Sequence, residues 1–93
     1  MITAIVLIET DVNSIPEAAE QIAEIEGVSE VYSVAGDADL VAMVRVREHE
    51  HLADVIADKV SKVPGVRETK TFIAFRTYSR HDLESAFSLG LDS

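Results

Sequence analysis

The chain has 93 residues, which is enough for one domain around a single core and too few for two. Hydrophobic residues make up 47% and charged residues 27%, a balance typical of a globular chain and not of a disordered one. Acidic residues outnumber basic ones by 17 to 8, giving a formal charge of -9. Because such a surface repels phosphate groups, we expect no direct contact with nucleic acid or with anionic lipid.

The absence of cysteine excludes disulfides, thiol nucleophiles and thiolate metal sites. The apolar run that opens the chain, Ile2 to Ile8, has no basic segment before it and no small-residue cleavage site after it. It therefore predicts a first strand and not a signal peptide. No other run approaches the length that spans a membrane, so we expect a cytoplasmic protein.

The first helix is predicted directly after this strand. Ser14-Ile15-Pro16-Glu17 has the pattern of a capping box, with proline in the first turn, where its missing N–H costs little. Apolar residues then recur at helical spacing through Ile22 to Ile25. Gly27 stands where the end of a helix favours a residue that tolerates positive φ, and a second strand follows.

The second half of the chain repeats this order. Gly36-Asp37-Ala38-Asp39 predicts a turn between two strands, of which the later one is Leu40 to Val46. A second helix and a final strand from Val66 to about Tyr78 come next. The predicted helix carries Leu52, Val55, Ile56, Lys59, Val60 and Val63, and Pro64-Gly65 ends it. Ser79-Arg80-His81-Asp82 can cap a short last helix with Leu83, Ala86, Phe87 and Leu89.

An internal repeat connects the two halves. The segment 22–30 matches the segment 60–68 at a constant offset, with paired branched apolar residues followed by Gly, Val and Glu at the same positions. Strand, helix and strand therefore occur twice, in βαββαβ order. Two right-handed crossovers of this kind place the first and third strands in the centre of a four-stranded antiparallel sheet, with both helices on one face. The sequence predicts a ferredoxin-like α+β sandwich.

The central strands are apolar on both faces. Ile5 and Leu7 lie opposite the even-numbered apolar residues of the first strand, and Val41 and Met43 do the same in the third. Helices cover only one face of such a sheet, and an antiparallel sheet with one solvated face alternates apolar with polar residues. The second face therefore needs a cover, and a second subunit that packs sheet against sheet is our expectation. A C-terminal helix folded over that face is the alternative.

The Gly36–Asp39 turn is the main candidate binding site. A glycine turn exposes backbone N–H groups, and the neighbouring Asp37 and Asp39 carboxylates can receive an ammonium, so together they suit a free amino acid. A solvated hairpin turn is the alternative. Thr69 and Thr71 alternate with Lys70 and point to the same face, where their hydroxyls line a polar pocket or serve only as ordinary strand residues.

Signals for metal or catalytic chemistry are weak. His49 and His51 are two residues apart and are flanked by glutamates, and no third metal ligand follows at a usual spacing. We therefore interpret the segment 48–51 as the solvated start of the second helix. No phosphate-binding glycine loop and no Ser/His/Asp pattern of recognised spacing is present. We expect no metal, no cofactor and no enzyme activity.

The stretch from Val31 to Tyr78 resembles the effector-binding domain of the Lrp/AsnC transcription regulators, often called the RAM domain. In that family, Gly-Asp-x-Asp and an aliphatic run mark the turn into the third strand, as in the segment 36–44 here. An apolar-patterned helix, Pro64-Gly65-Val66 and the Thr-x-Thr of residues 69–71 follow in the family's order. The resemblance extends over about residues 2–78, so we divide the chain into a RAM domain, 1–79, and a C-terminal helical extension, 80–93.

The resemblance implies a dimeric α+β barrel formed through the sheets, in a family whose dimers assemble further into rings, commonly octameric. It also implies an amino-acid effector at Gly36, Asp37, Ala38 and Asp39, with Thr69 and Thr71 as further candidates. The family's regulators carry an N-terminal helix-turn-helix domain, whereas this sequence opens directly on the first strand, so DNA binding is not expected of it.

Three functions remain open at this point. The first is an amino-acid-sensing domain that acts as a homo-oligomer or in mixed assembly with a full-length Lrp/AsnC regulator. The second is a small dimeric α+β barrel enzyme, of the oxygenase or isomerase kind, which needs a titratable residue in a cavity between helices and sheet. The third is a structural module whose oligomerisation is itself the function.

Overall fold

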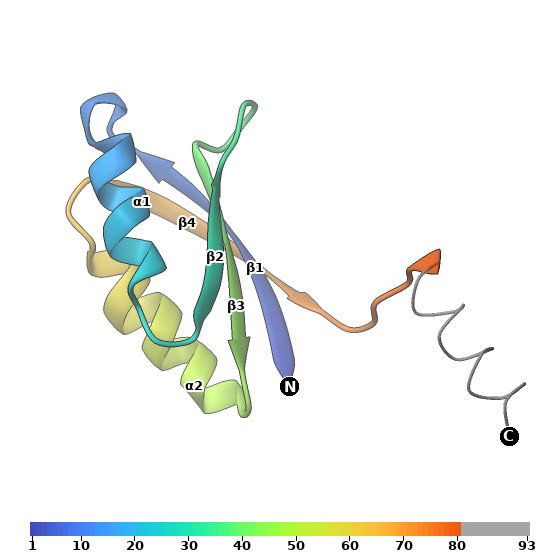
Figure 1. The fold of residues 1–93 in the computed structure, drawn as a ribbon. Helices are drawn as coiled ribbons and strands as arrows, with labels where there is room; N and C mark the ends of the chain where they lie inside the picture. The colour runs from blue at the N-terminus through green and yellow to red at the C-terminus, as the bar shows by residue number, and fades with distance from the viewer. Residues whose placement is uncertain (81–93) are drawn as a thin grey trace, which may run out of the picture.

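The computed structural model describes residues 1–80, which form a four-stranded antiparallel sheet with the helices on one face (Figure 1). The strand order is β2-β3-β1-β4, so the first and third strands are central, as the double crossover predicts. The strands are β1 (Ile2–Thr10), β2 (Val28–Ser33), β3 (Leu40–Val46) and β4 (Val66–Ala74), and the helices are α1 (Ile15–Ala23) and α2 (His49–Ala53). The predicted ferredoxin-like α+β fold is confirmed.

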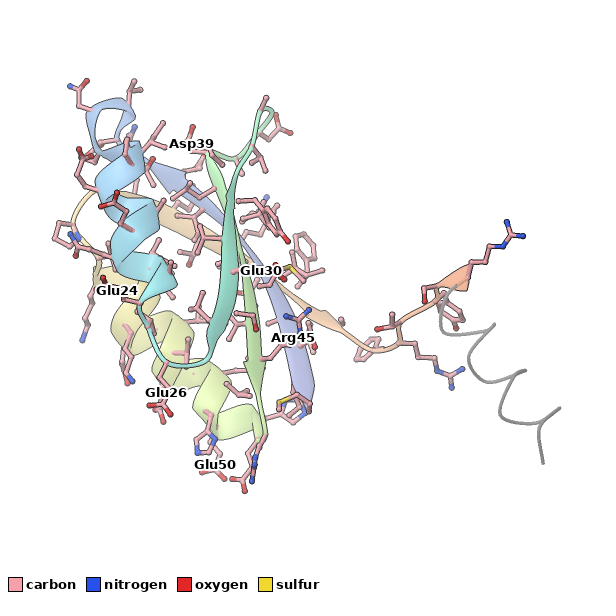
Figure 2. The ribbon with its side chains drawn as sticks, viewed as in Figure 1. Glu24, Glu26, Glu30, Asp39, Arg45 and Glu50 are labelled. Atoms are coloured by element: carbon pink, nitrogen blue, oxygen red, sulfur yellow. The ribbon has the colours of Figure 1, made fainter. Side chains whose placement is uncertain are left out.

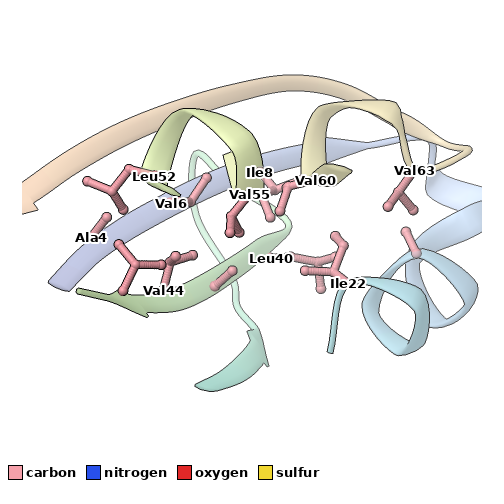
Figure 3. Packing of buried hydrophobic residues seen from close by; sticks show 13 residues of the cluster. Ala4, Val6, Ile8, Ile22, Leu40, Val44, Leu52, Val55, Val60 and Val63 are labelled. Atoms are coloured by element: carbon pink, nitrogen blue, oxygen red, sulfur yellow. The ribbon is translucent and has the colours of Figure 1, made fainter. Parts of the chain in front are cut away.

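The core lies between the sheet and the helices (Figure 3). Alternate residues of β1 and β3 point to this side and are buried, and the helices contribute the opposite wall. The buried side chains are Ala4, Val6, Ile8, Ala18, Ile22, Leu40, Ala42, Val44, Val46, Leu52, Val55, Val60 and Val63. The alternation read from the sequence therefore assigns the helix-facing side of both central strands correctly.

The last strand is shorter than predicted. β4 pairs with β1 from Val66 opposite Thr10 to Ala74 opposite Thr3, with an irregularity at Glu9 and Thr10. Beyond Ala74 the chain runs past the first residues of β1, so the predicted extension to about Tyr78 is wrong. At its other end β1 continues to Thr10, two residues past the predicted limit.

The predicted capping box does not form at the start of α1. The Ser14 side chain makes no capping hydrogen bond, and a 3-10 turn, η1 (Val12–Ser14), precedes the helix. Ser14 instead lies against Gly65, where an added Cβ would be 2.6 Å from the Ser14 Cβ. Pro16 does occupy the first turn, and Gly27 and Gly65 both have positive φ, at 100° and 94°.

The second helix is continuous in space but not uniform in its hydrogen bonding. After α2 the chain continues as a π-helical segment, η2 (Asp54–Lys59), and a 3-10 turn, η3 (Val60–Lys62). Val55 and Val60 are both buried although they are five residues apart. An α-helix with about 3.6 residues per turn does not keep that spacing on one face, whereas i→i+5 bonding does. The predicted apolar residues thus reach the core by a different helical geometry.

The predicted C-terminal helix, with Leu83, Ala86, Phe87 and Leu89, lies outside the described residues, as does all of the 80–93 extension except Arg80. The possibility that this helix covers the open sheet face therefore stays a prediction. Within residues 1–80, every helix is too short or too polar to cross a membrane.

Candidate functional site

The predicted Gly-Asp turn lies in the 34–39 loop, which extends beyond the end of the sheet between β2 and β3 (Figure 1). Gly36 has φ of 135°, and a Cβ at this position would meet no atom within 4 Å. The backbone conformation, and not a lack of space, therefore favours glycine here. Asp37 is exposed, whereas Ala38 and Asp39 are half-buried.

Asp39 is held by the fold. Its Oδ2 accepts a hydrogen bond from the backbone N–H of Thr10 at 2.9 Å. Its own N–H donates to the carbonyl of Ile8 at 2.9 Å, and its carbonyl accepts from the N–H of Val34 at 3.0 Å. Figure 2 shows Asp39 at this end of the sheet. These bonds attach the base of the loop to the end of β1. Of the two predicted ammonium acceptors, Asp39 is thus already engaged and Asp37 is free to face a ligand.

Asp37 contributes to a small open cavity of about 190 Å³ on the sheet face that the helices do not cover. The cavity brings the loop together with the adjacent ends of β1 and β4. Its lining residues are Leu7, Glu9, Asp37, Glu68, Thr69 and Lys70. Of the six residues predicted for the binding site, Asp37 and Thr69 are in this lining, and Gly36, Ala38, Asp39 and Thr71 are not.

Three charged residues of the cavity were missed by the sequence analysis. In the β1–β4 register Leu7 lies opposite Lys70 and Glu9 lies opposite Glu68. Side chains of directly opposed residues share a face of the sheet, so the three charges gather beside Leu7 on the uncovered side. The Gly-Asp motif marks one wall of the cavity, but only the strand register identifies the other.

The electrostatics of the cavity are dominated by carboxylates. Glu9, Asp37 and Glu68 line it together with a single cation, Lys70. The pKa of Glu9 is raised above its ordinary value by a hydrogen bond with Glu68 and by the negative charge of that group, with smaller contributions from desolvation and from Asp39. Crowded carboxylates of this kind favour a bound proton or a bound cationic group.

Thr69 and Thr71 lie on the same face of β4, as predicted. They are opposite Ile8 and Val6, whose side chains are buried on the helix side of the sheet. Because β4 is an edge strand, Thr69 is nevertheless half-buried and Thr71 exposed. Thr69 is part of the cavity lining, whereas Thr71 lies farther along the strand and is not.

The uncovered face of the sheet is apolar at its centre. Ile5, Leu7, Val41 and Met43 are half-buried, because neighbouring strands screen them only partly. On the flanking strands Phe72 is 52% exposed and Tyr32 49% exposed. The neighbouring charges include an ion pair between Arg45 Nη1 and Glu30 Oε1 at 3.6 Å. An apolar centre with a charged rim is the composition of a protein interface.

The two helix-start histidines, His49 and His51, are exposed on α2. Within the described part of the chain, no three His, Cys, Asp or Glu side chains are grouped so as to hold a metal ion. The cavity beside Asp37 also contains no histidine.

Comparison with known proteins places this fold and loop in one family. The profile described as the Lrp/AsnC ligand binding domain matches residues 3–83. An uncharacterised HTH-type transcriptional regulator of Pyrococcus horikoshii is 42% identical over 78 residues, which are 81% of this chain and 52% of the regulator. The chain thus spans about half the length of the curated relatives that it matches.

Solved structures agree with this placement. The crystal structure of the protein TTHA0845 from Thermus thermophilus is 48% identical, with a TM-score of 0.81, and the match covers 86% of this chain and all of that one. A feast or famine regulatory protein from M. tuberculosis, solved in complex with L-methionine, is 32% identical with a TM-score of 0.71, over 86% of this chain and 54% of that one. The chain therefore belongs to the Lrp/AsnC family and comprises its ligand-binding domain.

Proposed function

We propose that this chain is a regulatory domain that binds an amino acid in the cavity between the 34–39 loop and the adjacent ends of β1 and β4. Its role is to respond to the ligand and not to transform it, and it acts in the cytoplasm. The observation that carries the proposal is that Asp37 and Lys70 line the same cavity. Asp37 can accept hydrogen bonds from an ammonium, and Lys70 can donate to a carboxylate.

The size and position of the cavity support a small effector. A volume of about 190 Å³ is below the range of roughly 300–1,000 Å³ typical of sites for drug-sized ligands. Leu7 provides an apolar surface beside the charged groups, as a ligand with a hydrocarbon side chain requires. The M. tuberculosis relative is complexed with L-methionine, which has both a zwitterionic and an apolar part.

The uncovered sheet face supports a homodimer that packs sheet against sheet. Ile5, Val41 and Met43 form its centre, and Phe72 and Tyr32 flank them. Fully covering an exposed aliphatic side chain contributes about 1.5–3 kcal/mol and covering these half-buried ones contributes less each, so a partner stabilises this face more than solvent does. Because the Asp37 cavity opens on the same face, a partner subunit lies close to the effector. Such dimers are the units from which an octameric ring, or a mixed assembly with a full-length Lrp/AsnC regulator, is built.

Binding is tested by the thermal stabilisation of the chain with a panel of the twenty amino acids. A ligand specific for the folded state raises the melting temperature with its concentration. Asp37→Asn and Lys70→Gln each remove one of the two charges and are expected to reduce the shift. Lys62→Gln, which removes an exposed cation that lines neither described cavity, is the matched control. The proposal fails if no amino acid changes the melting temperature, or if all three variants respond like the parent.

A further inference from the structure

A second and larger cavity, of about 460 Å³, lies at the opposite end of the sheet from the 34–39 loop. It is formed where β3 ends, between the α1–β2 connection and the second helix. Figure 2 places Glu26 and Arg45 toward this end of the molecule and Asp39 at the other. Its lining includes Gly27, Arg45, Val46, Arg47, Val55 and Lys59.

The floor of this cavity is apolar and closely packed. Val46 and Val55 belong to the core and are only 8% and 5% exposed. Gly27 fits so closely beside them that an added Cβ would be 2.9 Å from Val55 Cγ2 and 3.4 Å from Val46 Cγ1. The carbonyl of Gly27 accepts a hydrogen bond from the N–H of Arg45 at 2.8 Å, which fixes the loop to the strand. A ligand therefore meets a preformed hydrocarbon surface.

One wall of the cavity is the π-helical segment. Asp54, Val55 and Lys59 all belong to η2. A π-helical insertion changes the directions in which successive side chains leave the helix, and such insertions are frequent at functional sites. Here it places a charged residue at each end of the segment beside the apolar floor. This geometry is independent of the loop that forms the first cavity.

The cavity holds an unusual share of the chain's cations. Arg45, Arg47 and Lys59 line it, out of eight Lys and Arg residues in a chain of charge -9. Arg45 is paired with Glu30. Arg47 and Lys59 form no ion pair with any residue in 1–80. The lining therefore carries one more cation than carboxylates, and two unpaired donors are available to an anion.

We propose that this cavity binds a small carboxylic acid with an aliphatic side chain, at a site separate from the amino-acid cavity. Arg47 and Lys59 hold the carboxylate, and the floor of Val46 and Val55 takes the hydrocarbon part. Glu26 and Asp54 also line the cavity and repel a second negative charge, which selects a monocarboxylate over a phosphate ester. Two sources share this chemistry, a 2-oxo acid and an amino acid.

The test is an amide chemical-shift titration of the full chain with 4-methyl-2-oxopentanoate, with leucine and with inorganic phosphate. We expect the oxo acid to shift the amides of Gly27, Val46 and Val55 and to leave those of Gly36 and Asp37 unchanged. If leucine shifts the same three amides, the site accepts both a 2-oxo acid and an amino acid. If leucine leaves them unchanged, the site is specific for acids without an ammonium group. Chemical-shift changes at Gly36 and Asp37 report separately on the amino-acid cavity. The proposal for either site can therefore be rejected without rejecting the other.

Variants make the assignment specific. Arg47→Gln and Lys59→Gln each remove a charge-assisted donor and are expected to weaken oxo-acid binding about tenfold. Lys62→Gln is the matched control and keeps the parent affinity. The proposal is overturned if the oxo acid leaves the Gly27, Val46 and Val55 amides unmoved. It is equally overturned if phosphate binds more tightly than the oxo acid, or if both variants bind like the control.

Discussion

The carboxylate of Asp39 accepts a hydrogen bond from the backbone N–H of Thr10, 29 residues earlier in the chain, at 2.9 Å. This bond joins the base of the 34–39 loop to the end of the central strand β1. Thr10 is only 4% exposed, so water does not readily replace the acceptor. The second acidic residue of the Gly36–Asp39 turn therefore holds the loop in place, and the neighbouring Asp37 is left to face the cavity.

Asp39→Ala is expected to destabilise the fold by about 1.5–3 kcal/mol, because it removes a charged acceptor from a buried N–H. Asp39→Asn keeps a carbonyl oxygen at this position and is expected to lose less. Asp37→Asn, in the same loop but exposed, is the control and is expected to unfold like the parent. Urea unfolding of the three variants gives the comparison. Equal unfolding free energies for Asp39→Ala and the parent would contradict the anchoring role.

A substitution at Thr10 is expected to stabilise the fold, in contrast to Asp39→Ala. Its Oγ1 is buried and, within the described residues, makes no hydrogen bond. Thr10→Val has nearly the same shape, removes that hydroxyl and keeps the backbone N–H that Asp39 accepts from. We expect the variant to be more stable by about 1 kcal/mol, since it no longer desolvates a polar group without compensation. A loss of stability in the same urea experiment would show that the hydroxyl has a partner in solution.

Gly65→Ala is expected to destabilise the fold by about 2–4 kcal/mol, because it combines backbone strain at φ of 94° with a Cβ placed 2.6 Å from the Ser14 Cβ. Gly36→Ala separates the two effects, since its φ of 135° is also unfavourable but no atom lies within 4 Å of the new Cβ. The double variant Gly65→Ala with Ser14→Gly should recover the steric part only. If Gly65→Ala and Gly36→Ala cost the same, the contact with Ser14 is unimportant.

The Glu9–Glu68 pair predicts a pH dependence of stability. The pKa of Glu9 is raised in the folded chain above its ordinary value of 4.5, so the folded state holds this proton more tightly than the unfolded state. The stabilisation from this proton is fully present below pH 4.5 and is lost as the pH rises through the folded pKa. Glu9→Gln removes the repulsion, so it should melt higher than the parent at about pH 7 and should lose that advantage at about pH 4. A lower melting temperature for Glu9→Gln at neutral pH would contradict this account.

The order of elements could be predicted because each half of the chain repeats the same local signals. Gly27 and Gly65 mark equivalent turns, and the alternation along β1 and β3 identifies the core side of the sheet. The errors arise where a neighbour in space decides the outcome. Ser14 lies against Gly65 and makes no capping hydrogen bond, and β4 stops at Ala74, which pairs with Thr3 near the start of β1.

The candidate site could be predicted only in part, for a related reason. The Gly-Asp motif is local, so Asp37 was identified from the sequence. The other charged residues, Glu9, Glu68 and Lys70, belong to two strands. The register between these strands cannot be predicted from the sequence of either strand alone. A shift of β4 by one residue would move Glu68 and Lys70 to the helix side and leave Glu9 on the uncovered face. The charged wall of the cavity is therefore a property of the pairing and not of a motif.

The uncovered sheet face yields a prediction about assembly. Met43 lies on β3 opposite Ile5 of β1, at the centre of this face, and both are half-buried. If the proposed sheet-to-sheet dimer forms, Met43→Lys is expected to convert it to a monomer, because pairing two such faces would bury the new ammonium in an apolar interface. Val12→Lys makes the same change at a side chain that is 82% exposed on the η1 turn, away from the sheet, and should leave the dimer intact. Sedimentation equilibrium of the three proteins gives their masses, and circular dichroism verifies that each is folded. A folded Met43→Lys variant that sediments with the parent's mass would show that the subunits do not associate through this face.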